Sequence, residues 1–108
     1  MEGNVIRHIV LFNFLPTATR EQTEAVIAMA RDQLSRIPGV RNLAVSTSFE
    51  VVQPPAYRYA LTMEFADEDA LRGYIDHPVH QEFRKVFFPV RESSLVVDLR
   101  EMEGSAWV

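Results

Sequence analysis

A tyrosine and two histidines stand close together in the second half of the chain. Tyr74, His77 and His80 occupy the segment 74–83, which Pro78 interrupts. Histidine titrates near neutral pH and can accept a proton there. A tyrosine hydroxyl can donate a hydrogen bond to an oxyanion that develops in the same reaction. If Tyr74 and His80 face one cavity, the segment predicts proton transfer with stabilisation of a developing oxyanion.

The elements expected around Pro78 bring Tyr74 and His80 together. A helix begins at the acidic residues 67–69 and carries Tyr74 on its inner face. The residue before a proline is disfavoured in a helix, so this helix ends at Pro78, which can itself begin a second helix. His80 then lies in the first turn of the second helix, at the edge of its apolar face. A helix N-terminus disfavours the imidazolium and so favours the basic, neutral form of His80.

Each of these residues also has an interpretation without chemistry. His80 could cap backbone groups, and Tyr74 could be a core residue with a solvated hydroxyl. His77, which precedes Pro78, is interpreted as a loop histidine that binds backbone. His8 lies on an apolar strand, which is typical of a core histidine with a satisfied hydrogen bond.

The sequence excludes several other kinds of site. The chain has no cysteine, which rules out disulfides, thiolate catalysis and thiolate metal sites. His77 and His80 are three residues apart across a helix break, and no carboxylate–histidine repeat accompanies them, so we predict no metal site. Glycine-rich phosphate loops, a Ser-His-Asp pattern and haem-type signatures are missing from the sequence. We therefore expect no cofactor.

Length and charge indicate one domain and argue against nucleic-acid and membrane partners. The 108 residues fit one domain, 1–108, with its core at about 5–100 and a C-terminal tail at 101–108. The net charge is −4 and the basic residues are scattered, so neither a nucleic-acid-binding stripe nor a polybasic membrane patch forms. Residues 1–4 do not resemble a signal peptide, and no apolar stretch is long enough to span a membrane. We expect a cytoplasmic protein that binds neither nucleic acid nor membrane.

Hydrophobic patterning predicts an α+β fold. Strands are expected at 5–14, 40–52, 57–65 and 94–99, and helices from a cap at Thr19 to Ile37 and on both sides of Pro78. Thr19 and Gln22 form a capping-box pattern at the start of the first helix. The order β-α-β-β-α(α)-β is that of a ferredoxin-like fold, in which a four-stranded antiparallel sheet has helices on one face.

The other face of the sheet is also expected to be apolar. Both sets of alternate side chains in 5–14 are largely apolar, and the last strand carries Leu95, Val96, Val97 and Leu99. Four strands of about eight residues present roughly 500 Å² on one face. Leaving such a face in water would forfeit up to ~12 kcal/mol. A second copy stacked on this face removes the exposure, so we predict a homodimer through the sheet face.

Three segments of the chain resemble one known family. The segments 6–12, 74–83 and 96–98 are similar to the stress-responsive dimeric α/β-barrel (Dabb) family, and the H-P-x-H sequence at 77–80 is the most specific part. The resemblance extends over about 5–100. It implies that two ferredoxin-like domains pair by their sheets into a dimeric α+β barrel.

The resemblance also implies roles for individual residues. The family includes olivetolic acid cyclase-like polyketide cyclases, which close a linear poly-β-keto thioester by aldol condensation without a cofactor. The histidine base of such a cyclase matches His80, its assisting tyrosine matches Tyr74, and a strand histidine matches His8. The resemblance therefore implies these three as catalytic residues.

The ligand pocket is expected between the sheet and the helices. The aromatic pocket residues on the first helix of such a cyclase fall on Val26, Ile27 and Ala30 here, so the pocket has a different shape. The full set of predicted pocket residues is Phe12, Val26, Ile27, Ala30, Met63, Phe83 and Phe87. The expected ligand is therefore small and mostly apolar.

Three functions are compatible with this pattern. The first is a cofactor-free polyketide cyclase, aldol-type or proton-transfer enzyme that acts on a small apolar carbonyl compound. The second is a non-catalytic dimeric barrel that responds to stress or binds a small ligand. The third and weakest is a cofactor-independent monooxygenase, because related dimeric barrels include such enzymes. An enzyme of the first kind requires an open cavity that reaches both Tyr74 and His80.

Overall fold

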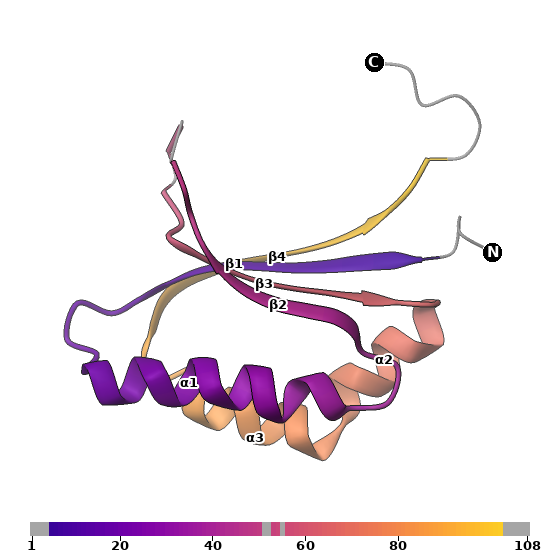
Figure 1. The fold of residues 1–108 in the computed structure, drawn as a ribbon, viewed down its shortest axis with the longest axis horizontal. Coiled ribbons are helices and arrows are strands. Elements are labelled where there is room, and N and C mark those ends of the chain that lie inside the picture. Colours follow the sequence, from indigo (N-terminus) through magenta and orange to yellow (C-terminus); the bar gives the residue numbers. More distant parts are fainter. Residues whose placement is uncertain (1–4, 51–52, 55, 103–108) are drawn as a thin grey trace.

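The chain forms a four-stranded sheet with its helices on one face. The computed structural model describes residues 5–50, 53, 54 and 56–102, so residues 1–4 and most of the expected tail at 101–108, including Trp107, lie outside it. The elements are β1 (Ile6–Phe14), α1 (Arg20–Asp32), the 3₁₀ helix η2 (Leu34–Arg36), β2 (Arg41–Thr47), β3 (Tyr59–Phe65), α2 (Glu68–Asp76), α3 (Pro78–Phe87) and β4 (Arg91–Arg100). The strands are antiparallel in the order β2-β3-β1-β4. With the helices layered beneath the sheet (Figure 1), the predicted ferredoxin-like fold is confirmed.

The core lies between the sheet and the helices. Alternate residues of β1 point to this side, so Ile6, His8 and Phe12 are buried while Arg7 is exposed. The helices contribute Val26 and Ala30 from α1, Leu71 and Tyr74 from α2, and Phe83 and Phe87 from α3. His8 points inward because side chains alternate along β1. The inward-facing residues of α2 and α3 include aromatic side chains, so His8 lies among them.

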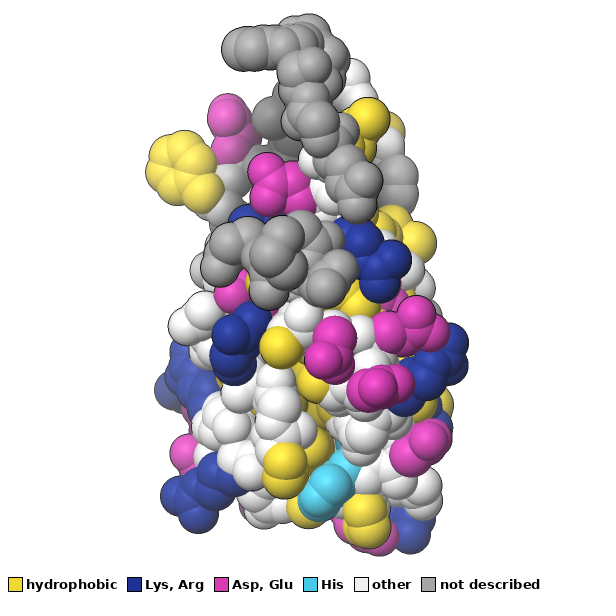
Figure 2. Space-filling view, turned by 90° about the vertical axis from the view of Figure 1, so that its right-hand side faces the viewer, with side chains coloured by type: hydrophobic (Ala, Val, Ile, Leu, Met, Phe, Trp, Pro, Cys, Tyr) yellow, Lys and Arg dark blue, Asp and Glu magenta, His cyan; other side chains and the backbone are white. Residues whose placement is uncertain are grey.

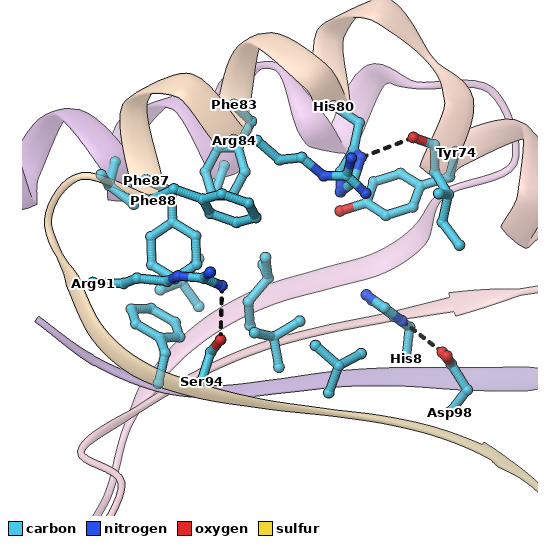
Figure 3. A pocket seen from close by; sticks show the side chains of 18 residues that line it. His8, Tyr74, His80, Phe83, Arg84, Phe87, Phe88, Arg91, Ser94 and Asp98 are labelled. Carbon is cyan, nitrogen blue, oxygen red and sulfur yellow. Dashed lines mark hydrogen bonds and ion pairs between the residues drawn. The ribbon is translucent and has the colours of Figure 1, made fainter.

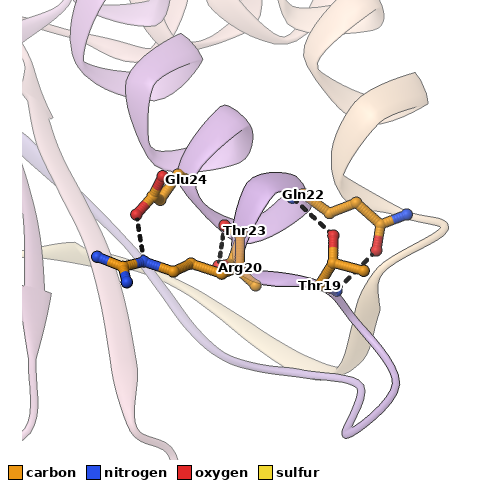
Figure 4. Close-up of polar contacts among 5 residues, drawn as sticks. All are labelled: Thr19, Arg20, Gln22, Thr23 and Glu24. Atoms are coloured by element: carbon orange, nitrogen blue, oxygen red, sulfur yellow. Dashed lines mark hydrogen bonds and ion pairs between the residues drawn. The ribbon is translucent and has the colours of Figure 1, made fainter.

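The start of α1 confirms the predicted capping box. Thr19 Oγ1 accepts a hydrogen bond from the Gln22 backbone N–H at 3.1 Å, and Gln22 Oε1 accepts one from the Thr19 N–H at 2.9 Å (Figure 4). The expectation of one continuous helix to Ile37 is wrong, because α1 ends at Asp32 and the chain tightens into η2. Ile37 is nevertheless buried, so this residue of the predicted apolar stripe packs in the core as expected.

Removing this cap is expected to destabilise the protein measurably. Thr19→Ala leaves the backbone N–H groups of the first turn of α1 without the side-chain acceptor, which costs about 1 kcal/mol in the free energy of unfolding. Urea unfolding followed by circular dichroism measures the difference. Thr17→Ala is the control, since Thr17 is exposed and precedes the helix. Equal stability of the two variants would refute this role of Thr19.

The break at Pro78 is present and is held by a histidine. α2 ends at Asp76, and α3 begins at Pro78, whose missing N–H is not needed at the first helical position. His77 Nδ1 accepts a hydrogen bond from the Val79 N–H at 3.1 Å and so caps α3. His77 thus binds backbone, as the sequence indicated.

The lengths of two strands differ from the expectation. β2 ends at Thr47 instead of extending over 40–52, of which residues 51 and 52 lie outside the described part. β4 begins at Arg91 instead of at 94. Asn42 has a φ of 54°, and the β2–β3 register shifts between Arg41 and Ala44, which marks a bulge. Strand ends and bulges depend on the pairing partner, which a single strand's alternation does not reveal.

The face of the sheet opposite the helices carries a narrow apolar stripe. Ile9 pairs with Val97 and Leu11 with Leu95 in neighbouring strands, so these side chains share the open face. Leu95 is 45% exposed. Val96 points to the helix side instead, and Arg7 belongs to the open face, so the apolar area is smaller than the whole-face estimate.

The charged side chains are spread over the surface in short pairs. Acidic and basic side chains are interspersed on the end of the molecule shown in Figure 2. Along the helices, Arg20–Glu24, Arg72–Glu68 and Lys85–Glu82 form exposed ion pairs, which contribute little to stability. No helix within the described residues is long and apolar enough to cross a membrane.

Candidate active site

A cavity of about 220 Å³ lies between α3 and the helix-facing side of the sheet (Figure 3). Its lining, which is mostly apolar, includes these residues predicted for the site: His8, Phe12, Val26, Ala30, Tyr74, His80, Phe83 and Phe87. Phe88 and Val96 also line it and are 45% and 53% exposed. The cavity therefore opens to solvent between α3 and the edge strand β4.

Ile27 and Met63 do not line this cavity, although both were expected in the pocket. Val26 and Ala30 are four residues apart and share one face of α1, whereas Ile27 is rotated about 100° from Val26 around the helix axis. Met63 is 1% exposed and lies opposite His8 in the β1–β3 pairing, within the closed core. Met63 therefore lies on the predicted face of the sheet, but deeper in the core than the cavity.

His80 presents an unprotonated ring nitrogen to the cavity. Its Nδ1 lies 3.0 Å from the backbone carbonyl oxygen of Ile75. Because a carbonyl only accepts hydrogen bonds, Nδ1 carries the proton and Nε2 keeps its lone pair. Burial lowers the pKa of His80 from its usual 6.5, the hydrogen bond to Ile75 opposes this shift, and the positive charge of Arg84 adds to it. His80 is therefore a neutral base at neutral pH.

The Tyr74 ring packs against the His80 ring. The two ring centroids are 4.5 Å apart. No buried side-chain oxygen or nitrogen of the described residues lacks a partner, and none of those residues binds the Tyr74 hydroxyl, so this group reaches the cavity (Figure 3). Burial raises the pKa of Tyr74 well above its usual 10. The hydroxyl therefore stays protonated and can donate a hydrogen bond.

His8 is held by Asp98, which belongs to the family-like segment 96–98 but was not predicted as a site residue. His8 and Asp98 are paired residues of β1 and β4, and His8 Nδ1 lies 2.6 Å from Asp98 Oδ1. The carboxylate accepts this hydrogen bond, so Nδ1 donates it and the His8 ring is fixed 5.7 Å from the Tyr74 ring, centroid to centroid. Asp98 shares its face with Val96 by strand alternation, which is the signal that could have placed it here.

Arg84 and Arg91 are further lining residues that the sequence did not single out. Arg84 follows His80 by four residues on α3, a spacing that puts two side chains on one helix face. That spacing could have revealed Arg84. Arg91 follows α3 after a short turn, and only the tertiary structure brings its side chain to the cavity.

The pKa of His80 gives a direct test of this geometry. We expect His80 to titrate below 6.5, and Arg84→Gln to raise its pKa because the substitution removes a nearby positive charge. Histidine ring resonances followed by NMR between pH 4 and 8 measure both values. Lys85→Gln, on the exposed side of α3, should leave the value unchanged. A titration at or above 6.5 in the unmodified protein would contradict the buried, neutral base.

The arrangement is suited to proton transfer. The cavity holds a neutral histidine base, a protonated tyrosine and a second histidine oriented by a carboxylate. In the described part of the chain, no three histidine, aspartate or glutamate side chains converge in a way that could hold a metal ion. These groups can accept a proton from carbon and donate hydrogen bonds to an oxyanion.

Comparison with known proteins assigns the chain to a family. The stress responsive A/B barrel domain matches residues 6–101. The chain belongs to the stress responsive A/B barrel (Dabb) family. The resemblance inferred from the segments 6–12, 74–83 and 96–98 is thereby confirmed. A search of curated proteins finds no match.

Solved structures share the fold of this Dabb protein. A dimeric ferredoxin-like protein of unknown function from Thermobifida fusca is 29% identical, with a TM-score of 0.79 and 93% of each chain covered. A hydroxynitrile lyase from Passiflora edulis is 20% identical, with a TM-score of 0.84 over 95% of this chain and 98% of the lyase. SnoaB, a cofactor-independent oxygenase from Streptomyces nogalater, is 14% identical, with a TM-score of 0.71 over 95% and 97%. At the identities of the two enzymes, the similarity shows the fold alone.

Proposed function

We propose that this Dabb protein is a cofactor-free enzyme that removes a proton from the carbon next to a carbonyl group. The observation that carries the proposal is the hydrogen bond from His80 Nδ1 to the Ile75 carbonyl, which leaves Nε2 as a base in an apolar cavity. A buried histidine whose pKa is lowered is unprotonated near neutral pH and can act there as a general base. The Tyr74 hydroxyl, next to that base, supplies a hydrogen bond to the oxygen.

In the proposed reaction, His80 Nε2 takes the α-proton and the C–H electron pair forms an enolate. Tyr74 donates a hydrogen bond to the enolate oxygen, where negative charge develops. The α-carbon then attacks a second carbonyl of the same molecule, forming a carbon–carbon bond. The resulting alkoxide recovers the proton from His80, so the base is regenerated. Polyketide cyclisation is one reaction of this aldol type.

Two features around the base support this assignment. The positive charge of Arg84 lies close enough to influence both Tyr74 and His80, and it would also stabilise an enolate between them. His8, oriented by Asp98, stands on the other side of Tyr74 as a second hydrogen-bonding group. The occurrence of a lyase and an oxygenase among proteins of this fold is consistent with catalysis on the scaffold.

We further infer that the working form is a homodimer through the open face of the sheet. Ile9, Leu11, Leu95 and Val97 form an apolar stripe on that face, and Leu99 next to it is 47% exposed. A structural relative that is 29% identical is described as dimeric. Stacking a second sheet on the stripe would remove apolar area from water on both copies.

Exchange of an α-proton tests the proposed activity without knowledge of the natural substrate. The probe is 4-phenyl-2-butanone, a small, mostly apolar ketone, in D₂O near neutral pD. We expect the protein to accelerate deuterium uptake at the α-carbons, measured by ¹H NMR, because His80 removes the proton and returns a deuteron from solvent. Exchange no faster than in buffer, across a panel of such ketones and β-diketones, would overturn the proposal.

A further inference from the structure

Arg84 and Arg91 differ from the other basic residues of the chain. The other lysine and arginine side chains are all exposed, whereas Arg84 and Arg91 are half-buried. Both of these arginines line the cavity that holds His80. A guanidinium that loses part of its hydration needs polar or anionic partners in return. Because both arginines line one cavity, the partners that they need are to be sought in the molecule that this cavity binds.

The described residues do not neutralise these two charges. Three basic residues on the helix surfaces, Arg20, Arg72 and Lys85, pair with glutamates three or four positions away. No carboxylate of the described residues comes within ion-pair distance, 4.0 Å, of Arg84 or Arg91. Asp98 is the one carboxylate in the cavity lining, and it is hydrogen-bonded to His8 at 2.6 Å. The cavity is therefore apolar with an excess of positive charge.

Arg91 is held in place at the cavity mouth. Its Cζ lies 3.7 Å from the centroid of the Phe88 ring, and its Nη1 donates a hydrogen bond to Ser94 Oγ at 3.0 Å. Its other N–H groups have no partner among the described residues. Figure 3 shows Arg91 on the Phe88 side of the cavity, with Tyr74 and His80 at the other end. A planar guanidinium fixed in this way matches the two oxygens of a carboxylate.

We propose that the cavity binds a carboxylate-bearing molecule, with the carboxylate on Arg91 at the mouth and an apolar body extending past Phe83 and Phe87 toward His80. That the inner end of this molecule is a reactive carbonyl rests on the proposed function. The carboxylate site itself does not, because it depends on Arg91 and Ser94 and not on the base. The substrate class is thus a small carbonyl compound with a carboxylate at its far end.

Matched probes that differ only in charge test this carboxylate site. We expect 3-phenylpropionate to bind at least about tenfold more tightly than the neutral 3-phenylpropionamide, because a charge-assisted bidentate contact to a guanidinium is lost in the amide. Isothermal titration calorimetry measures both dissociation constants. We also expect the Arg91 Nε–H resonance to shift on addition of 3-phenylpropionate but not of the amide. Equal affinity of the unmodified protein for the two probes would by itself overturn the proposal.

Variants assign the preference to Arg91. Arg91→Gln should reduce the preference for the carboxylate probe to less than about twofold, and Arg91→Lys should retain part of it because the positive charge remains. Lys85→Gln, which removes an exposed charge from α3, should leave the preference unchanged. His80→Asn should also leave it unchanged, which separates this site from the proposed base. An unchanged preference in folded Arg91→Gln would refute the role of Arg91.

Discussion

Replacing His80 by alanine is expected to slow the exchange of 4-phenyl-2-butanone α-protons by about 10²- to 10⁴-fold, the contribution of a positioned general base. Neither of the other histidines occupies this position, because His8 lies against the Tyr74 ring on strand β1 and His77 caps α3. The exchange rate measured by ¹H NMR at several ketone concentrations separates the loss of kcat from any change in KM.

A second substitution separates chemistry from packing at this position. His80→Asn keeps an amide N–H that can bind the Ile75 carbonyl, but has no basic nitrogen. It should therefore retain the thermal stability of the parent while losing exchange as strongly as His80→Ala. Gln81→Ala, the next and exposed residue of α3, is the matched control and should exchange normally. Retained exchange in His80→Asn would show that His80 is structural.

Replacing Val97 by glutamate is expected to raise the dissociation constant of the homodimer by at least about 100-fold. Val97 lies opposite Ile9 on the open face, so the new carboxylate would be buried between two sheets at a cost of several kcal/mol. Sedimentation velocity over a range of protein concentrations measures the shift from dimer to monomer.

The control for this substitution is the same change on a different surface. Val86→Glu alters an exposed residue of α3, 39% accessible, that lies neither on the sheet face nor in the cavity lining. It should leave the dimer intact. If the parent chain is itself monomeric at micromolar concentration, or if Val97→Glu dimerises as well as Val86→Glu, the open face is not the interface.

The order of elements and the inward face of each could be predicted because they follow from local rules. Period-two alternation placed His8 and Phe12 on one side of β1, the Thr19 side chain marked the start of α1, and Pro78 fixed the break between α2 and α3. Tyr74 and His80 meet because that break turns the chain between them. The residues predicted as catalytic therefore line one cavity, although their roles stay predictions.

The partners of these residues could not be predicted so well, because they depend on tertiary contacts. The acceptor that fixes the His80 tautomer is the backbone carbonyl of Ile75, which has no sequence signal. Asp98 reaches His8 only through the β1–β4 register, and Arg91 reaches the cavity only through the turn after α3. Ile27 was misplaced because helical spacing alone does not tell which part of a wide apolar face borders a cavity.

The measurement that tests the neutral base most directly is the pH dependence of α-proton exchange, recorded with the NMR titration of His80 in the same protein. Burial lowers the pKa of His80, so the basic form persists below pH 6.5. We expect kcat/KM to fall on the acid side with an apparent pKa below 6.5 that coincides with the titration of His80. A rate that is independent of pH between 4 and 7, or an acid limb that follows another group, would contradict His80 as the base.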